Sequence, residues 1–181
     1  MTIVRTPIPH IFEKTANEFL RNGIDGLVVI VNPFVCVWSG QLPLYHAEHC
    51  RERNIPVLFG EYLGGCIVNM PGDLSLARTT WGDSDYGERV TAAATVWLKD
   101  RGVAVCRDGN DVLADGKKVA SWAKAISENG WCQSVVHFSV GTMDLELIKS
   151  ICLKPMEKIP GSLGDYGIKA EDIWDVVKDI A

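Results

Sequence analysis

The chain has 181 residues, a formal net charge of −5, 47% hydrophobic residues and 23% charged residues. This length suits one domain whose core is large enough to fold without disulfides or a structural metal, so we expect a single domain over residues 1–181. The composition argues against a disordered chain and against a membrane protein, and an acidic chain without a lysine or arginine cluster argues against nucleic acid as the partner.

The first third of the chain contains a clear helical pattern followed by apolar strand-like runs. Residues 10–22 place apolar side chains at helical spacing and end before Gly23, which predicts an amphipathic helix. Residues 26–31 form a continuous apolar run, and residues 34–38 resume after a turn at Asn32-Pro33, so we predict a pair of strands. This region is completed by a predicted short helix at 45–53 and a predicted strand at 55–59.

The second half of the chain mixes helical and strand patterns. Asp85 and Glu88 have capping-box spacing, and apolar residues then recur every three or four positions up to Gly102, which predicts a helix. Asp115-Gly116 supplies the turn of a tight hairpin, and residues 135–140 alternate as a half-buried strand. Further predictions are helices at 143–153 and 170–180, and core positions for Trp38, Trp97 and Trp122. Strands in local groups interrupted by helices predict a mixed α+β fold, in which helices flank a β-sheet core.

The sequence shows no pattern of a signal peptide or membrane span, and its cysteine spacing is typical of a protein in a reducing compartment. The longest apolar stretch, residues 26–38, is interrupted and too short to span a bilayer, and the first seven residues lack the apolar segment of a signal peptide. We therefore predict a cytoplasmic protein that does not engage a membrane. The six cysteines contain no C-x-x-C pair, which favours reduced, buried thiols over a disulfide framework or a metal site.

Two short segments are candidates for chemistry. Lys118 lies on an otherwise small, apolar strand directly after the hairpin turn, although composition alone would favour a solvated turn lysine. Gly64-Gly65 lies in a glycine-rich loop, where backbone N–H groups can approach an anion because no side chain blocks them. The spacing of these glycines matches neither common phosphate-binding motif, so a bulge or tight turn is an equal alternative.

In chain order, these segments resemble the lipoate–protein ligase family, within the group that includes octanoyltransferases and biotin–protein ligases. Residues 59–74 align without a gap with the family glycine motif, roughly R-R-x-S-G-G-G-x-V-x-H-D-x-G-N-L. Residues 110–121 align with its lysine motif, N-D-(aliphatic)-x-V-x-G-x-K-(I/V)-(A/S)-G, which is the more specific match. The resemblance runs through most of the chain and implies the catalytic domain of that family.

The resemblance also implies a reaction and a set of roles. A fatty carboxylate, lipoate or octanoate, would react with ATP, with Mg²⁺ as a further cofactor, and the acyl group would pass to a lysine of a lipoyl-type carrier domain. Lys118 would be catalytic, because its ammonium would stabilise the charge that develops on the acyl and phosphate oxygens. The implied cofactor-binding residues are Gly64, Gly65, Asn110 and Asp111. The implied substrate-binding residues are Cys66, Ile67, Val68, Asn69, Ala120 and Ser121.

The chain departs from the family pattern at several positions. Phe59 and Gly60 stand where the family has paired arginines, and Leu63, Asn69 and Ser121 replace a glycine, a histidine and a glycine. Loss of two guanidinium groups removes bidentate phosphate contacts, so we expect weak ATP binding. We also expect no C-terminal accessory domain, so a separate accessory subunit would have to supply it if the complete reaction needs it.

Three alternatives remain open at this stage. An acyltransferase that takes its acyl group from a carrier protein would need a nucleophilic cysteine or direct transfer instead of ATP. For Cys152 and Cys132 a buried apolar thiol is the preferred interpretation, and His137 is interpreted as a residue on the polar face of its strand. The second alternative is a non-enzymatic family member that binds an acyl ligand, a carrier domain or a partner subunit. The third is an enzyme similar to biotin–protein ligases.

Overall fold

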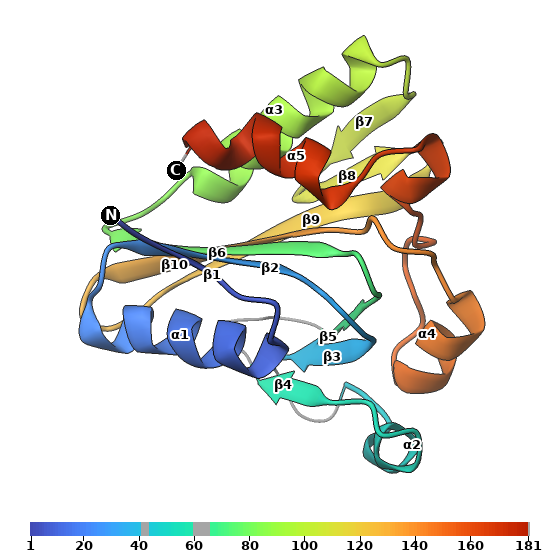
Figure 1. The fold of residues 1–181 in the computed structure, drawn as a ribbon, viewed down its shortest axis with the longest axis horizontal. Coiled ribbons are helices and arrows are strands. Elements are labelled where there is room, and N and C mark those ends of the chain that lie inside the picture. The colour runs from blue at the N-terminus through green and yellow to red at the C-terminus, as the bar shows by residue number, and fades with distance from the viewer. Residues whose placement is uncertain (41–43, 60–65, 181) are drawn as a thin grey trace.

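The computed structural model describes residues 1–40, 44–59 and 66–180, which form the mixed α+β fold expected from the sequence (Figure 1). The large sheet contains, in spatial order, β1 (Thr2–Arg5), β2 (Gly26–Val31), β6 (Leu74–Trp81), β10 (Trp131–Phe138), β9 (Lys117–Ile126), β8 (Asp111–Ala114) and β7 (Val105–Asp108). The small sheet contains β4 (Val57–Phe59), β3 (Cys36–Ser39) and β5 (Cys66–Asn69). Within the large sheet β1 is parallel to β2 and the other pairs are antiparallel.

Helices cover both faces of the large sheet. The helices are α1 (Pro9–Asn22), α2 (Ala47–Glu52), α3 (Tyr86–Asp100), α4 (Leu145–Ile151) and α5 (Ala170–Val177), with 3₁₀ turns η1 (Leu163–Tyr166) and η2 (Lys178–Ile180). Helices α3 and α5 lie on one face, whereas α1 and the small sheet lie on the other (Figure 1). Adjacent residues of β6 show this division. Leu76 packs into the hydrophobic cluster under α3, which we call the α3-side core, and Ala77 packs into the cluster under α1. A third cluster packs the small sheet against α4.

Several predicted elements are confirmed, and their local chemistry explains their ends. Helix α1 ends at Gly23, whose φ of 64° is the left-handed conformation that favours glycine at a helix C-terminus. The hairpin between β8 and β9 turns at Asp115 and Gly116, with φ values of 47° and 76°, as a two-residue hairpin requires. The turn therefore fixes where Lys118 enters the sheet.

The predicted strand pair around Asn32-Pro33 is wrong. Strand β2 belongs to the large sheet and β3 to the small sheet, so the two strands do not pair. The Asn32 N–H donates to the Asp73 carbonyl (2.8 Å) and the Gly72 N–H donates to the Asn32 carbonyl (2.7 Å). Asn32 is thus paired with the turn between β5 and β6, and the chain crosses from one sheet to the other at this point.

Other local predictions also need correction. Asp85 and Glu88 form no capping box, because their carboxylates bind Arg89 and Arg107 instead. Strand β10 is buried on both faces, whereas its alternation predicted one solvated face, since α1 and the small sheet cover the second face of the large sheet. Two core predictions were too strong: Trp38 is buried, but Trp97 and Trp122 are only partly buried. The short, exposed strand β1 was not predicted.

Candidate functional site

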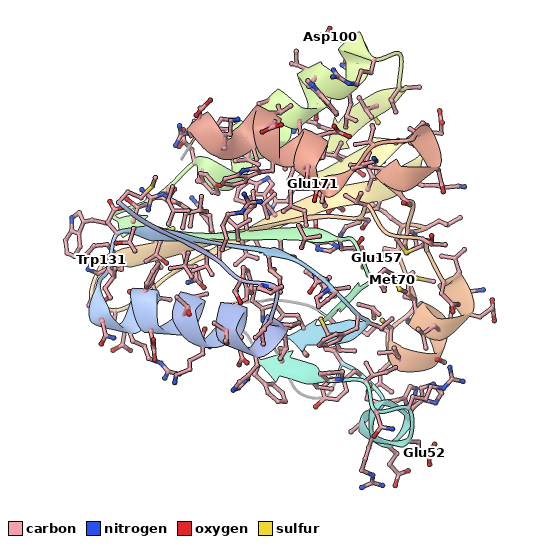
Figure 2. All side chains as sticks on the ribbon, in the orientation of Figure 1. Glu52, Met70, Asp100, Trp131, Glu157 and Glu171 are labelled. Atoms are coloured by element: carbon pink, nitrogen blue, oxygen red, sulfur yellow. The ribbon has the colours of Figure 1, made fainter. Side chains whose placement is uncertain are left out.

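A cavity of about 410 Å³ lies where β5, β8, β9 and β10 approach α4 and the segment that follows it. This volume falls in the range of about 300–1,000 Å³ that is typical of small-molecule sites. Figure 2 labels Glu157, which lines the cavity, at the α4 end of the molecule and Trp131 at the opposite end. The two ends of the large sheet therefore differ, and the cavity lies at the end near α4.

The polar part of the cavity is built around one carboxylate. Asp111 Oδ1 lies 2.9 Å from Lys118 Nζ, and Asp111 Oδ2 lies 2.7 Å from Lys158 Nζ. Lys158 Nζ is also 2.9 Å from Asp108 Oδ2, so four charges of alternating sign form a continuous row. Burial raises the pKa of Asp111, but hydrogen bonds from Lys158 and Lys118 outweigh it, and the net pKa lies below the usual value. The Asp111 carboxylate is consequently charged at neutral pH.

Backbone pairing brings the two lysines together although forty positions separate them. The Lys118 N–H donates to the Ile159 carbonyl, and the Gly161 N–H donates to the Lys118 carbonyl, each at 2.8 Å. Gly161 permits this approach, because a Cβ at that position would lie 2.7 Å from Lys117 Cβ. Residues 159–161 therefore lie against the start of β9, with Lys158 directly before them.

The opposite part of the cavity is apolar and contains two thiols. Its apolar lining includes Leu44, Ile67, Val68, Met143, Ile148 and Met156. Cys66 and Cys152 line the same wall, and a hydrogen bond with Cys152 raises the pKa of Cys66. The same hydrogen bond lowers the pKa of Cys152, although burial acts in the opposite direction. Cys152 is thus the member of the pair that loses its proton more readily.

A buried polar network begins at the cavity lining with His137 and extends to Asp73. His137 lines the cavity and is 6% exposed, with Nδ1 3.1 Å from Ser75 Oγ and Nε2 3.4 Å from Ser139 Oγ. His137 Nε2 also lies 3.6 Å from a carboxylate oxygen of Asp73, which is fully buried. Burial lowers the pKa of His137, the Asp73 carboxylate opposes this effect, and Lys118 adds to it. The interpretation of His137 as a solvated polar-face residue is therefore wrong, and the imidazole is neutral at physiological pH.

The structure gathers some of the predicted site residues and separates others. Lys118, Asp111, Cys66, Ile67, Val68 and Ser121 line the cavity. Asn110 is exposed in the turn between β7 and β8, and Ala120 is buried in the α3-side core. Asn69 is buried and its side-chain oxygen accepts from Asn32 Nδ2 at 3.3 Å. None of these three is among the cavity-lining residues. Gly64 and Gly65 lie outside the described residues.

Three contributors to the site were not predicted. Lys158 has no motif around it, and only the pairing of residues 159–161 with β9 brings it to Asp111. Asp73 is fully buried, and its carboxylate accepts hydrogen bonds from three backbone N–H groups. A Pro-Gly-Asp turn in the sequence does not predict this role. The prediction of a buried apolar thiol at Cys152 is wrong, because Cys152 is partly exposed and lines the cavity.

Two findings bear on metals and membranes. Within residues 1–40, 44–59 and 66–180, no group of three or more His, Cys, Asp or Glu side chains is placed to hold a metal ion. None of the described helices has the length and apolar character needed to cross a membrane.

Solved structures of lipoate–protein ligases share this fold, each matching 99% of the chain. A bipartite lipoate protein ligase described with its E2 lipoyl domain, from Thermoplasma acidophilum, has 17% identity and a TM-score of 0.76, with 80% of its own chain covered. Lipoate-protein ligase A bound with ATP has 15% identity and a TM-score of 0.76, with 83% of its chain covered. P. falciparum LipL1 in complex with lipoate has 12% identity and a TM-score of 0.76, with 60% of its chain covered.

The sequence comparisons add nothing to this result, because no protein-family model and no curated protein matches the chain. At identities below 20% the structural similarity establishes the fold. The chain therefore has the fold of the lipoate–protein ligases, as the glycine and lysine motifs predicted.

Proposed function

We propose that the protein is an acyltransferase of the lipoate–protein ligase type, which attaches a lipoyl or octanoyl group to a lysine of a lipoyl-type carrier domain. The observation that carries this proposal is that one cavity has an apolar wall in one part and the Lys118–Asp111 ion pair in the opposite part. The apolar wall suits a medium-length acyl chain, and the ammonium of Lys118 suits the oxygen on which charge develops during acyl transfer. A lipoyl domain is the expected acceptor, because one structural relative is described with its E2 lipoyl domain.

Each part of the cavity has a separate task in this reaction. The acyl chain would lie along Ile67, Val68 and Met143, which exclude water from the reacting carbon. Asp111 would orient the Lys118 ammonium through the 2.9 Å ion pair, so that its remaining donors face the acyl carbonyl. Held in this way, the ammonium needs little rearrangement when the oxygen becomes charged, and Lys118 therefore lowers the barrier.

A second route is favoured by the position of Cys152. Its thiolate would attack a thioester donor and release the donor thiol, and the carrier lysine would then take the acyl group as an amide and release the Cys152 thiolate. The lowered pKa of Cys152 and its place in the cavity wall support this route. This transfer needs no nucleotide, which agrees with the missing arginine pair.

The test is intact mass spectrometry of a lipoyl domain incubated with the protein. One set of reactions contains ATP, Mg²⁺ and either octanoate or lipoate, and another contains an octanoyl-carrier protein without nucleotide. A mass increase of one acyl group in the first set supports the ligase, and an increase in the second set supports the transferase. A Cys152→Ser variant separates them further, because only the thioester route should be lost. No increase in either set, together with binding of the lipoyl domain, would instead support the non-enzymatic alternative.

A further inference from the structure

The carboxylate of Asp111 is already occupied by two cations. Lys118 binds one oxygen and Lys158 binds the other, at 2.9 Å and 2.7 Å. Lys158 reaches a second carboxylate at the same time, since its Nζ is 2.9 Å from Asp108 Oδ2. An ammonium has three donors, so one N–H of Lys158 is left with only a long 3.4 Å approach to the Asp108 carbonyl.

This arrangement does not fit the magnesium ion that the family resemblance implies. Mg²⁺ in phosphate-handling sites is held by one or two protein carboxylates together with water and phosphate oxygens. At Asp111 both carboxylate oxygens face ammonium groups, and like charge would oppose a divalent ion placed beside them. The acidic side chains present here are therefore neutralised by lysine.

The backbone also fixes Lys158 beside Lys118 in the cavity lining. Residues 159–161 are hydrogen-bonded to both the N–H and the carbonyl of Lys118, and the two lysines bind the two oxygens of Asp111. Lys158 lines the cavity and its side chain is 27% exposed, so the ammonium is anchored but accessible to a ligand. A tethered ammonium in this position acts as a point charge for phosphate oxygens.

We infer that Lys158 is a phosphate-binding residue whose ammonium takes the place of a divalent metal ion beside Asp111. The inference rests on the proposed function. It adds to that function the positively charged group, the Lys158 ammonium, that binds the phosphate of a nucleotide or acyl-phosphate ligand. It leads to the expectation that nucleotide binding is independent of Mg²⁺ while Lys158 is present. Removing Lys158 frees Asp108 Oδ2 and Asp111 Oδ2, while Lys118 still binds Asp111 Oδ1, and nucleotide binding then becomes dependent on Mg²⁺.

Calorimetry with α,β-methylene-ATP, an analogue that cannot be cleaved at the reacting bond, tests this inference in the presence of octanoate. The wild type, Lys158→Met and Lys149→Met are each titrated in buffer with MgCl₂ and in buffer with EDTA. Methionine keeps the aliphatic stem of lysine and removes the charge. Lys149 is a matched control, because it forms an ion pair with Glu146 on the surface of α4 and does not line the cavity. Thermal unfolding without ligand checks that each variant is folded.

We expect the wild type and Lys149→Met to bind equally well in both buffers. Lys158→Met should bind about tenfold more weakly in EDTA and recover most of this loss in MgCl₂. The inference is overturned if the wild type loses about tenfold affinity in EDTA, if Lys158→Met equals the wild type in EDTA, or if Mg²⁺ restores nothing. It is also overturned if the wild type binds no nucleotide analogue in either buffer. That last result leaves the proposed function intact if octanoyl transfer from a carrier protein, measured by mass, still occurs.

Discussion

Asp73 holds together two chain segments next to cavity-lining residues, and its removal should destabilise the protein more than the removal of any surface carboxylate. Asp73 Oδ2 accepts the Met70 N–H at 2.7 Å, and Oδ1 accepts the N–H groups of Val140 and Gly141, both at 2.8 Å. These bonds tie the turn after β5 to the chain that leaves β10. Because the side chain is fully buried, water cannot replace them without a structural change.

The expected cost follows from the number of donors that lose their acceptor. A buried N–H without an acceptor costs about 1–3 kcal/mol, so Asp73→Ala should lower the free energy of unfolding by roughly 4 kcal/mol. In Asp73→Asn the amide oxygen can still accept from Val140 and Gly141, whereas the amide nitrogen faces the Met70 N–H. This variant should therefore lose about 2 kcal/mol.

Urea denaturation followed by tryptophan fluorescence measures both values. Asp100→Ala is the control, because Asp100 is exposed at the far end of α3 (Figure 2), and its loss should change stability by less than about 0.5 kcal/mol. Unfolding of Asp73→Ala within about 1 kcal/mol of the wild type, or an asparagine variant as unstable as the alanine variant, would show that these three hydrogen bonds do not set the stability at Asp73.

Three further predictions concern the cavity. Burial lowers the pKa of His137, so the unfolded chain binds a proton that the folded protein does not, and stability should fall as the pH drops below about 6.5, by up to about 1.4 kcal/mol per pH unit. His137→Gln should flatten this slope in urea denaturation at several pH values, and an unchanged slope would contradict it. Octanoate should raise the Tm, by about 2–4 °C for each 1 kcal/mol of ligand-linked stability. Ile67→Trp, which fills the cavity, should abolish this shift, whereas Ile126→Trp at an exposed position should not. Octanoate should also slow alkylation of Cys152 by iodoacetamide and leave the exposed Cys106 unaffected, as peptide mass mapping would show; equal protection of both thiols would argue against an acyl site beside Cys152.

Much of the fold could be predicted because local signals decide it. Gly23 ends α1, and Asp115-Gly116 sets the hairpin turn that places Lys118 at the cavity. These features depend on the conformations of a few neighbouring residues, which a sequence displays directly. The lysine motif around Lys118 was informative for the same reason.

The rest of the site depends on contacts between distant segments. Lys158 reaches Asp111 only because residues 159–161 pair with the start of β9, and no periodic pattern marks that pairing. The alternation of its strand predicts a solvated face for His137, but α1 and the small sheet cover that face. The crossing from one sheet to the other at Asn32 could not be predicted for a similar reason. A turn sequence does not show whether the strands before and after it pair with each other or with other strands.

In the proposed function the Lys118 ammonium, and not simply a positive charge at the start of β9, carries acyl transfer. The adjacent Lys117 offers a direct comparison, because it is exposed and does not line the cavity. The most direct measurement is the intact mass of a lipoyl domain after incubation with wild type, Lys118→Met or Lys117→Met, in the reactions that contain ATP or an octanoyl-carrier donor. We predict that Lys117→Met acylates the domain at the wild-type rate and that Lys118→Met does so at least about a hundredfold more slowly, with folding unchanged. Acylation by Lys118→Met at the wild-type rate would show that the Lys118 ammonium does not carry the transfer.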